Sequence, residues 1–585
     1  MKKAKFKLFR DWQVILFFIA IGFSLYANTL GNGMFWDDDD FVLNNRFLRS
    51  WHYFPRYFSE NLIAGSGLLS NYWRPGLLTV FSFEWHLWRN WAPGYHLVNA
   101  SFHIANAILL FFILLKIFRS RWLAIFTALF FLVHPLQTEA VSYVSGLGDS
   151  LSVFFIFWGI LFYLDFRVHE KIRAKNTSYL KALLMFALAL MSKETAIIMP
   201  ALIFVADFFS FRAEELPVGK RLKRVGVMAW PFFALAGIYI MARATILNFD
   251  STFNLYGEEN IFTMNFHIRL LTFFRILVIY FGLLLWPFGL HMERSVEIAT
   301  SFLSLPVLLG AALFLGLLTL ATIKFKRWPI FSFGIWWFFS SLAPVSNLAV
   351  PINGLLYEHW LYLPLIGVFL ILVWLGMTLV KKYHQGREVA VLTLTGFLIF
   401  LSVLTIRRNR DWHDPVTFYT KTLEYSSDSY RVINNLGMAY AQAGDFEKAE
   451  AAYQRAIALA LAEPVAYHNL ANLYLLKGQE DLAVKNFKIA ISCDSGFIFS
   501  YRALASFYLE NKDFEKAREV LESYPDCGAS KIEVLFLLAE ITADEGDFEK
   551  AFDYLEEALA LDPDNQAVRE AMGKVVWDLE AARKK

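Results

Sequence analysis

Residues 13–45 read QVILFFIAIGFSLYANTLGNGMFWDDDDFVLNN, an apolar segment followed by four consecutive aspartates. The apolar part, residues 13–30, is long enough to cross a bilayer as a helix. Four lysines and one arginine precede it within the first ten residues, and such a basic flank stays in the cytoplasm. The sequence therefore predicts that the acid run, Asp37 to Asp40, emerges on the opposite face of the membrane.

Four adjacent carboxylates repel one another, and this leaves three interpretations of the acid run. It is a solvated loop, a cation site, or a loop in which one carboxylate has a raised pKa and serves as a general base. A run of like charges is most often solvent-exposed. Residue type alone leaves all three open.

The composition indicates a multi-spanning membrane protein with a soluble attachment. The chain has 585 residues, of which 57% are hydrophobic and 17% aromatic, and its mean hydropathy is +0.42. This is too apolar for a soluble protein of this length. The net charge of +2 gives no support for nucleic-acid binding. No A-x-A-like cleavage site follows the first apolar segment, so we interpret it as a retained helix.

Twelve apolar stretches recur before residue 406, but twelve simple crossings conflict with the loop charges. The first three basic loop clusters fall on the cytoplasmic side, whereas those at 324–327 and 381–387 would fall outside. Making one segment between 226 and 300 non-spanning, or splitting one in two, moves both clusters to the cytoplasmic side. The candidate is 259–290, as a partly interfacial segment. We therefore expect an odd number of spans, eleven being the simplest, and a C-terminal tail on the same side as the acid run. The stretches lie near 13–30, 95–117, 121–137, 149–166, 178–192, 195–210, 226–244, 268–290, 303–322, 329–343, 359–380 and 388–405.

A repeat of 34 residues fills the polar tail. Leu436, Leu470, Leu504 and Leu538 recur at this spacing, and an alanine follows each of them 13 residues later. A period of 34 with small residues where paired helices cross is typical of tetratricopeptide repeats. The sequence thus predicts an all-α chain with a multi-spanning domain and a solenoid. The predicted boundaries are 1–412 with a first outer loop at 31–93, then 413–585 with repeats near 430–463, 464–497, 498–531 and 532–565 and a capping helix over 564–583.

The solenoid has two interpretations that the repeat itself does not separate. It is a scaffold for protein assembly, or its concave surface binds the acceptor polypeptide of an enzyme. Its two cysteines, Cys493 and Cys527, lie one repeat apart, so their helices should be about 8–10 Å apart. That is beyond the reach of a disulfide, and we expect two free thiols.

Ionisable residues gather at the outer ends of the predicted spans. Such groups are costly inside a bilayer, by about 2.5–3.5 kcal/mol on insertion scales, so they are functional candidates. A carboxylate of the acid run can take a proton from a hydroxyl, while Arg74, Lys193 and Arg408 can hold a phosphate leaving group. The candidates for substrate binding are Arg74, His134, Glu139, Asp149, Lys193, Glu194, Glu358, His359 and Arg408.

The chain lacks the sequence motifs that are typical of other reaction classes. The chain has no G-x-x-x-x-G-K-[ST] loop, no H-E-x-x-H, no G-x-S-x-G and no set of cysteine ligands. His134, Glu139 and Asp149 offer a divalent cation three ligands, but their spacing matches no metal template. We expect no metal cofactor, with a divalent cation as the alternative.

These motifs, in this order, resemble those of the transmembrane and tetratricopeptide-repeat O-mannosyltransferases, which belong to the GT-C class of multi-spanning glycosyltransferases. Three departures stand out: His359 replaces an arginine, Gly148 replaces an arginine before Asp149, and the acid run extends to Asp40. The matching elements are Asp37 and Asp38 with Asn45, Arg74-Pro75, HPLQTEAVSYVSGLGD (134–149), SKE (192–194), LLLWPFGL (283–290), EHWLYLP (358–364) and RNRDW (408–412).

The resemblance implies a polyprenyl- or dolichyl-phosphate sugar as donor and a catalytic first outer loop. Asp38 is the expected base, with Asp37 in support. The enzyme hypothesis is inverting transfer of a sugar, first of all mannose, to a Ser or Thr of a protein on the non-cytoplasmic face. A lipid or cell-surface glycan is the alternative acceptor.

Two further hypotheses concern the class of protein. A non-enzymatic membrane anchor that displays the repeats as a scaffold remains open. A transporter is disfavoured because the polar groups gather at one face and not at the midplane. The outward segments 31–93, 245–267 and 413–585 contain no N-x-[ST] triplet. This favours a bacterial inner membrane with a periplasmic solenoid over the ER membrane.

Overall fold

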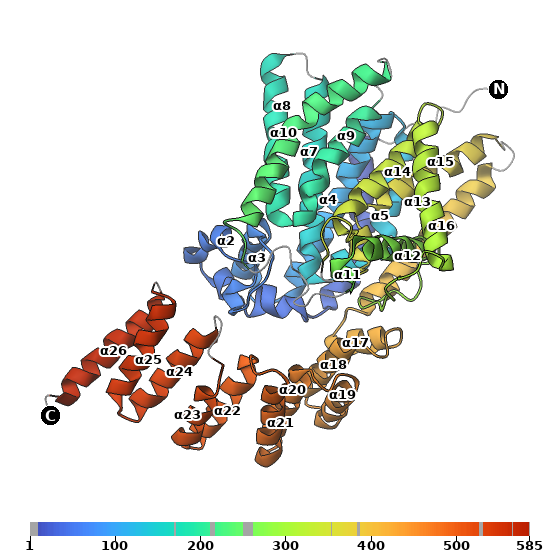
Figure 1. Ribbon diagram of the computed structural model, residues 1–585. Coiled ribbons are helices and arrows are strands. Elements are labelled where there is room, and N and C mark those ends of the chain that lie inside the picture. The colour runs from blue at the N-terminus through green and yellow to red at the C-terminus, as the bar shows by residue number, and fades with distance from the viewer. Residues whose placement is uncertain are drawn as a thin grey trace. The chain divides into compact units, whose positions relative to one another are not determined.

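The chain forms helices throughout and divides into two compact units, residues 1–421 and 422–585 (Figure 1). No strand occurs among the residues that the computed structural model describes, so the all-α prediction is confirmed. The N-terminal lysines and Cys527 lie outside the described residues. These are 10–168, 171–210, 217–249, 261–352, 354–382, 387–525, 530–563 and 565–583.

The helices of the first unit coincide with the apolar stretches of the sequence, and short helices fold the loops between them. They are α1 (Asp11–Tyr26), α2 (Arg56–Ser59), α3 (Pro75–Trp88), α4 (Ala92–Phe118), α5 (Arg121–Val133), α6 (Thr138–Ser142), α7 (Leu147–Val168), α8 (Ile172–Ser192), α9 (Met199–Phe208), α10 (Val218–Ala244), α11 (Ile261–Met264), α12 (Phe266–Leu285), α13 (Leu305–Ile323), α14 (Pro329–Leu342), α15 (Leu365–Lys382), α16 (Arg387–Arg410) and α17 (Pro415–Leu423).

Eight described helices are long and apolar enough to cross a membrane, or nine if the bent pair Arg121–Val133 and Pro135–Ser142 forms one span. Of the other predicted crossings, α9 has only 10 residues and α14 only 14. The count of eleven spans therefore stays a prediction. Helix α12 lies within 259–290, the segment that we expected to be interfacial, but it is long and apolar enough to cross a membrane. Figure 1 shows α12 running across the direction of its neighbour α13.

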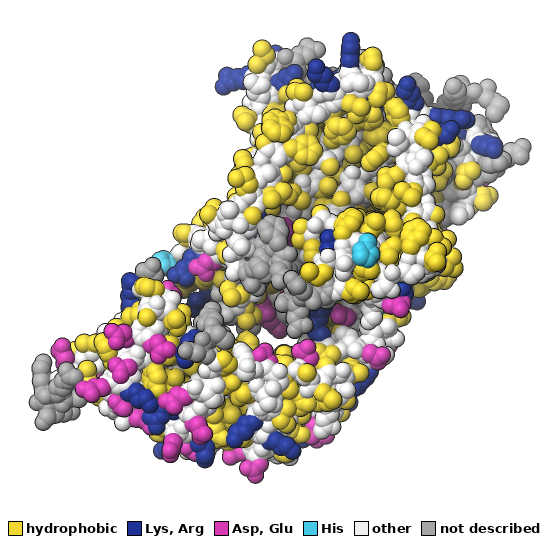
Figure 2. Space-filling view, in the orientation of Figure 1, with side chains coloured by type: hydrophobic (Ala, Val, Ile, Leu, Met, Phe, Trp, Pro, Cys, Tyr) yellow, Lys and Arg dark blue, Asp and Glu magenta, His cyan; other side chains and the backbone are white. Residues whose placement is uncertain are grey.

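One end of the first unit, which we call the basic end, comprises residues 116–121, 165–168, 207–210, 217–224 and 323–328. Ion pairs join its segments: Lys116 with Asp165 at 2.5 Å, Arg121 with Asp11 at 2.6 Å, and Arg167 with Asp207 at 3.1 Å. Figure 2 shows Lys and Arg side chains gathered there. The basic loop clusters up to residue 327 thus share one end, as their charges predict.

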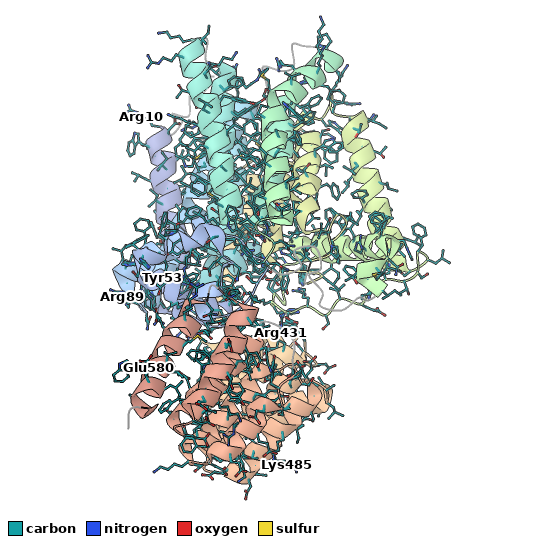
Figure 3. All side chains as sticks on the ribbon, turned by 60° about the vertical axis from the view of Figure 1, so that its left-hand side comes forward. Arg10, Tyr53, Arg89, Arg431, Lys485 and Glu580 are labelled. Carbon is teal, nitrogen blue, oxygen red and sulfur yellow. The ribbon has the colours of Figure 1, made fainter. Side chains whose placement is uncertain are left out.

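The opposite end, which we call the loop end, carries the first outer loop. Tyr53 and Arg89 of this loop lie at the end opposite Arg10 (Figure 3). Asn45 orders the loop, because its amide donates to the Leu62 carbonyl (3.0 Å) and its Oδ1 accepts from the Phe47 amide (3.2 Å). The loop's apolar side chains pack in one buried cluster with the start of α7. Asn45 therefore has a structural role in positioning the acid run.

Helices α14 and α15 cross so closely that only glycine fits at the contact. A Cβ on Gly334 would overlap the carbonyl oxygen of Gly367, and a Cβ on Gly367 would overlap that of Gly334. Small residues of this kind allow close backbone approach between membrane helices. By contrast, no atom lies within 4 Å of a Cβ on Gly376, also in α15.

We expect Gly367→Ala to destabilise the first unit by about 1–3 kcal/mol, the usual cost of overpacking a core. Gly376→Ala is the matched control and should be neutral. Thermal melting of the detergent-purified protein, with size-exclusion chromatography, measures the difference. Equal melting temperatures for the two variants would contradict the close crossing.

The second unit is a series of paired helices with the predicted period. Alanines 449, 483, 517 and 551 are all fully buried, as expected where paired helices cross. The predicted capping helix is α26. Cys493 is a free thiol that contacts the Leu461 carbonyl at 3.5 Å. The helices are α18 (Tyr430–Gln442), α19 (Phe446–Leu459), α20 (Pro464–Leu476), α21 (Glu480–Cys493), α22 (Ile498–Glu510), α23 (Phe514–Glu522), α24 (Ser530–Asp544), α25 (Phe548–Leu561) and α26 (Gln566–Arg583).

The boundary between the units lies at residue 421, later than the 412 predicted from the change in polarity. The reason is an aromatic cluster that holds the start of α17 against the first outer loop. Phe35 lies 5.2 Å from Phe418 and 6.3 Å from Trp412, measured between ring centroids. The chain just before the acid run is thereby tied to the end of α16 and the start of α17.

Candidate active site

The acid run begins at a strained residue. Trp36 has φ = 65°, in the left-handed region that non-glycine residues rarely adopt. Such strain costs about 1–3 kcal/mol and persists only where surrounding contacts hold it. Here Phe418 and Tyr419 hold the Trp36 ring, with centroids at 5.9 and 5.4 Å. The turn gives Asp37 and Asp38 different surroundings.

Asp38 points into the protein and is only 1% exposed. Its Oδ1 accepts from the amide (2.8 Å) and the hydroxyl (2.5 Å) of Ser145, and its Oδ2 accepts from the Phe35 amide (3.2 Å). Burial raises the pKa of the Asp38 carboxyl to about 8, although these donors act to lower it. Asp38 therefore ties the first outer loop to residues 143–146 and is shielded from any acceptor in solution.

Asp37 is partly exposed, unlike its neighbour. Its backbone amide donates to the Tyr143 hydroxyl (2.9 Å), which holds the backbone of Asp37 in position. The Tyr143 ring in turn stacks on Trp412 at 5.2 Å. Asp37 is thus the rigidly placed and more accessible acid of the pair.

Asp39 and Asp40 complete the acid run and are half-buried. Burial and the charge of Asp40 raise the pKa of Asp39 to about 6. The Asp40 carbonyl accepts from the Ser66 hydroxyl at 2.6 Å. Neither residue is fully solvated.

Arg74 forms a two-pronged ion pair with Glu194 beside the acid run. Its Nε lies 2.9 Å from Glu194 Oε2 and its Nη2 2.6 Å from Oε1. Burial acts to raise the pKa of Glu194, but Arg74 lowers it to about 2. The Arg74 guanidinium also lies 4.3 Å above the Tyr72 ring. Burial raises the pKa of Tyr72, and its hydroxyl is close enough to sense the charges of both Glu194 and Asp37.

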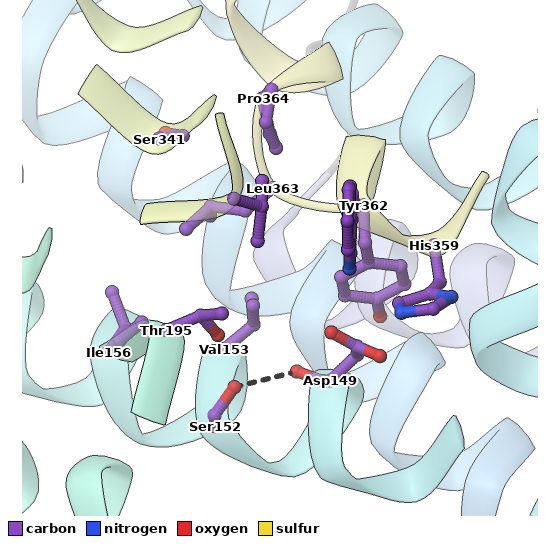
Figure 4. A pocket seen from close by; sticks show the side chains of 12 residues that line it. Asp149, Ser152, Val153, Ile156, Thr195, Ser341, His359, Tyr362, Leu363 and Pro364 are labelled. Atoms are coloured by element: carbon purple, nitrogen blue, oxygen red, sulfur yellow. Dashed lines mark hydrogen bonds between the residues drawn. The ribbon is translucent and has the colours of Figure 1, made fainter. Parts of the chain in front are cut away.

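Lys193, next to Glu194, pairs with Asp149 at the start of α7. Its Nζ lies 2.7 and 2.8 Å from the two Asp149 oxygens. The Asp149 side chain also lines a pocket of about 30 Å³, together with His359 and Tyr362. Figure 4 shows these three side chains turned toward one another. The pocket has room for about two water molecules and links Asp149 with the 358–364 segment.

Glu139 holds that segment in place. Its Oε1 lies 2.6 Å from His359 Nδ1, and its Oε2 accepts from the amides of Glu358 (3.0 Å) and His359 (3.2 Å). Glu139 is 1% exposed. Three interactions on one buried carboxylate indicate a positioning role for Glu139.

Glu358 is fully buried and gathers two arginines. Its Oε1 accepts from the His291 amide (2.8 Å) and from Arg294 Nη2 (3.1 Å), while Arg408 Nη2 lies 3.7 Å from Oε2. Arg408 Nη1 also donates to Asp411 at 3.1 Å. Within the described part of the chain, the buried Nε and Nη2 atoms of Arg408 have no hydrogen-bond partner. Such donors suit an anionic oxygen.

The structure places nearly all the predicted residues at the loop end. Arg74, Lys193, Glu194 and Asp149 form one network with Asp37 nearby, and Glu139, Glu358, His359 and Arg408 form the second. His134 joins neither network. It is buried, accepts the Leu136 amide at 3.3 Å and packs 5.0 Å from Phe369. Capping the turn Pro135–Gln137 accounts for His134 without a ligand.

Sequence reasoning missed Ser145, Tyr143, Tyr72 and Arg294. Ser145 and Tyr143 lie within the HPLQTEAVSYVSGLGD motif, but nothing in their spacing shows that they contact the acid run. Arg294 offered a usable signal, because it is a basic residue in a loop predicted to face away from the cytoplasm. Among the described residues, no group of three or more His, Cys, Asp or Glu side chains is arranged to hold a metal ion.

Comparison with known proteins matches both parts of the chain. Tetratricopeptide-repeat models match residues 430–460, 464–495 and 532–565. The mouse protein O-mannosyl-transferase TMTC3 is 23% identical over 75% of this chain and 50% of its own length. Fruit-fly Tmtc1 is 27% identical over 74% of this chain and 60% of its own length, and fruit-fly Tmtc2 is 30% identical over 48% and 30%. The chain thus spans about half the length of mouse TMTC3 and about three fifths of the length of fruit-fly Tmtc1.

Proposed function

We propose that this chain, which belongs to the transmembrane and tetratricopeptide-repeat O-mannosyltransferase family, transfers mannose from a polyprenyl- or dolichyl-phosphate donor to a Ser or Thr hydroxyl of a polypeptide. The relatives, which are named protein O-mannosyl-transferases, support mannosyl transfer. One observation carries the rest: a rigidly placed, accessible carboxylate lies beside buried cation networks at one end of the membrane helices. A lipid-phosphate sugar presents its reacting carbon and its leaving group at such a boundary.

Asp37 is the proposed general base, and Asp38 the acid that positions it. This reverses the roles expected from the sequence, because Asp38 is buried with both oxygens engaged by Ser145 and Phe35. A base must be able to approach the hydroxyl that it deprotonates. The Tyr143 hydroxyl holds the Asp37 amide, and Asp37 is partly exposed, so an acceptor can approach its carboxylate.

The proposed reaction is a single displacement with inversion. The acceptor oxygen attacks the anomeric carbon while the bond from that carbon to the phosphate oxygen breaks. The hydroxyl proton passes to Asp37, and the electron pair of the broken bond leaves with the lipid phosphate. No metal takes part in this scheme. The chemistry instead needs preorganised cations for the negative charge that develops on the leaving group.

Arg408 is the best-suited cation for the leaving phosphate. Arg74 already pairs with Glu194, and Lys193 with Asp149, at hydrogen-bonding distance. Arg408 is 6% exposed and keeps buried N–H groups without partners among the described residues. Arg294, on the other side of Glu358, also has a buried Nε without a hydrogen-bond partner in the described part of the chain. The two guanidiniums together offer a site for a phosphate.

The loop end is proposed to face away from the cytoplasm, because the basic end carries the positive loops. Helix α16 ends at the loop end, where Asn28 donates to the Ile406 carbonyl (2.9 Å) and Asn32 to the Asn409 carbonyl (3.1 Å). The chain therefore enters the solenoid on the proposed catalytic side. There the solenoid is proposed to bind the acceptor polypeptide. A bacterial inner membrane stays the predicted location, with the ER membrane as the alternative.

The test is transfer by the purified protein in proteoliposomes. We expect it to move labelled mannose from a polyprenyl-phosphate donor to a Ser- and Thr-rich peptide. Mass spectrometry of outer-face proteins should then show a hexose that is lost when the gene is deleted. Normal glycosylation in the deletion strain, with a phenotype that requires only residues 422–585, would favour the scaffold hypothesis instead.

A further inference from the structure

An apolar groove lies between α9, α10, α13 and α14, on the part of the first unit toward the basic end. It encloses about 430 Å³, within the usual range of about 300–1,000 Å³ for small-molecule sites. Apart from Thr322 and Ser340, every lining side chain is apolar. The largest of them are Phe204, Phe208, Phe209, Phe233, Phe325 and Trp336. A groove of this lining suits a hydrocarbon chain.

Arginines stand at the end of this groove. Arg221, in the first turn of α10, is buried, and its guanidinium lies 4.5 Å above the Phe208 ring. Arg224, one turn further along, lies 3.8 Å from Asp207 Oδ1. Lys324 and Lys326 flank the lining residue Phe325 in the sequence. The mouth of the groove is therefore strongly basic.

Among the described residues, the carboxylate that lies beside Arg224 is already engaged by other donors. Asp207 is 1% exposed and accepts from the Tyr163 hydroxyl (2.9 Å) and from Arg167 Nε (3.1 Å). At 3.8 Å, Arg224 is too far from it for a hydrogen bond. Among the described residues, the buried Nε and Nη2 atoms of Arg224 have no hydrogen-bond partner. Buried guanidinium donors of this kind call for an anionic oxygen.

We propose that the groove binds an anionic phospholipid from the leaflet at the basic end. One acyl chain lies between α9, α10, α13 and α14, and the phosphate contacts Arg224 and Arg221. Basic pockets between membrane helices on the cytoplasmic side suit such headgroups. Together, these features favour an anionic phospholipid. A free phosphate would leave the apolar groove unfilled, and a lipid without net charge would not balance the charge of the arginines. This site is separate from the proposed catalytic centre, whose phosphate belongs at the loop end.

Native mass spectrometry of the full-length protein in mild detergent tests the proposal. Phosphatidylglycerol is titrated against phosphatidylcholine. We expect retention of phosphatidylglycerol by the wild type, and about 25-fold weaker retention by the Arg221→Gln, Arg224→Gln variant, or about fivefold for each lost charge. Arg224→Gln alone should weaken retention about fivefold, and Lys223→Gln is its matched control, because it also removes one charge but from an exposed position on the same helix. It should retain the lipid normally.

A second variant tests the groove without changing charge. Ala201→Phe places a ring among the lining residues of α9 and should lower lipid retention at least tenfold while both arginines remain. This variant also keeps the test decisive if the double arginine variant does not fold.

Three outcomes would overturn the proposal. Equal losses for Lys223→Gln and Arg224→Gln would indicate attraction by the basic surface as a whole. Equal retention of phosphatidylcholine, which carries a phosphate but no net charge, would contradict the selection of an anionic headgroup. Displacement of phosphatidylglycerol by a polyprenyl-phosphate donor, with a raised donor KM for Ala201→Phe, would assign the groove to the donor's tail.

Discussion

Asp37→Asn is expected to lower kcat/KM for mannose transfer by about 10²–10⁴-fold, the usual contribution of a general base, while the protein stays folded. The amide side chain keeps the shape of the carboxylate but cannot take the acceptor's proton. The anchoring contact survives, because the Tyr143 hydroxyl contacts the backbone amide of Asp37 and not its side chain. Steady-state transfer in proteoliposomes measures the loss, and thermal melting establishes that the fold is intact.

The other acids of the run are the controls. Asp38→Asn should lower the melting temperature, because it replaces the acceptor of three hydrogen bonds with a side chain that carries only one oxygen. Asp39→Asn and Asp40→Asn should keep most of the activity. If Asp38→Asn were inactive but fully stable, and Asp37→Asn active, the base would be Asp38, as the sequence alone suggested.

Arg408→Gln is expected to lower kcat/KM by about 10²–10³-fold, the usual cost of losing one preorganised donor to a developing anion. The fold should survive, because Glu358 keeps Arg294 (3.1 Å) and the His291 amide (2.8 Å). If Arg408 stabilises the leaving phosphate, the substitution should mainly lower kcat. If Arg408 is purely structural, the substitution should mainly lower the melting temperature.

Arg407→Gln is the matched control for that prediction. It removes the same charge from the neighbouring position, where the side chain is exposed. Its kinetics should match those of the wild type within about twofold, since exposed charges contribute little. Equal losses in the two variants would mean that the general charge of the helix end matters and not the buried guanidinium.

Much of the fold follows from periodicity in the sequence. Apolar runs of span length locate the helices of the first unit, and the 34-residue spacing of Leu436, Leu470 and Leu504 locates the repeats. The boundary at residue 421 could not be read in this way, because it depends on aromatic contacts between Phe35 and Phe418, which are far apart in the chain. Polarity changes at residue 412, but packing continues beyond it.

The sequence predicted which residues lie at the site, but not the role of each residue. Motif order brings Arg74, Lys193 and Glu358 to one end of the helices, where the structure also places them. A run of four identical aspartates holds no information on which side chain turns inward. That choice depends on the positive φ of Trp36 and on the hydroxyl and amide of Ser145. His134 misled for the opposite reason: a histidine beside a proline can cap a turn as readily as bind a substrate.

Sidedness labelling with a membrane-impermeant thiol reagent tests most directly whether catalysis occurs opposite the basic end. Cys493 and Cys527 are first replaced with serine, and single cysteines are placed by Leu69→Cys in the first outer loop and Lys223→Cys at the basic end. Sealed right-side-out vesicles should label Leu69→Cys at once and Lys223→Cys only after permeabilisation. Labelling of both from the same side, or in the reverse order, would contradict the proposed catalytic face.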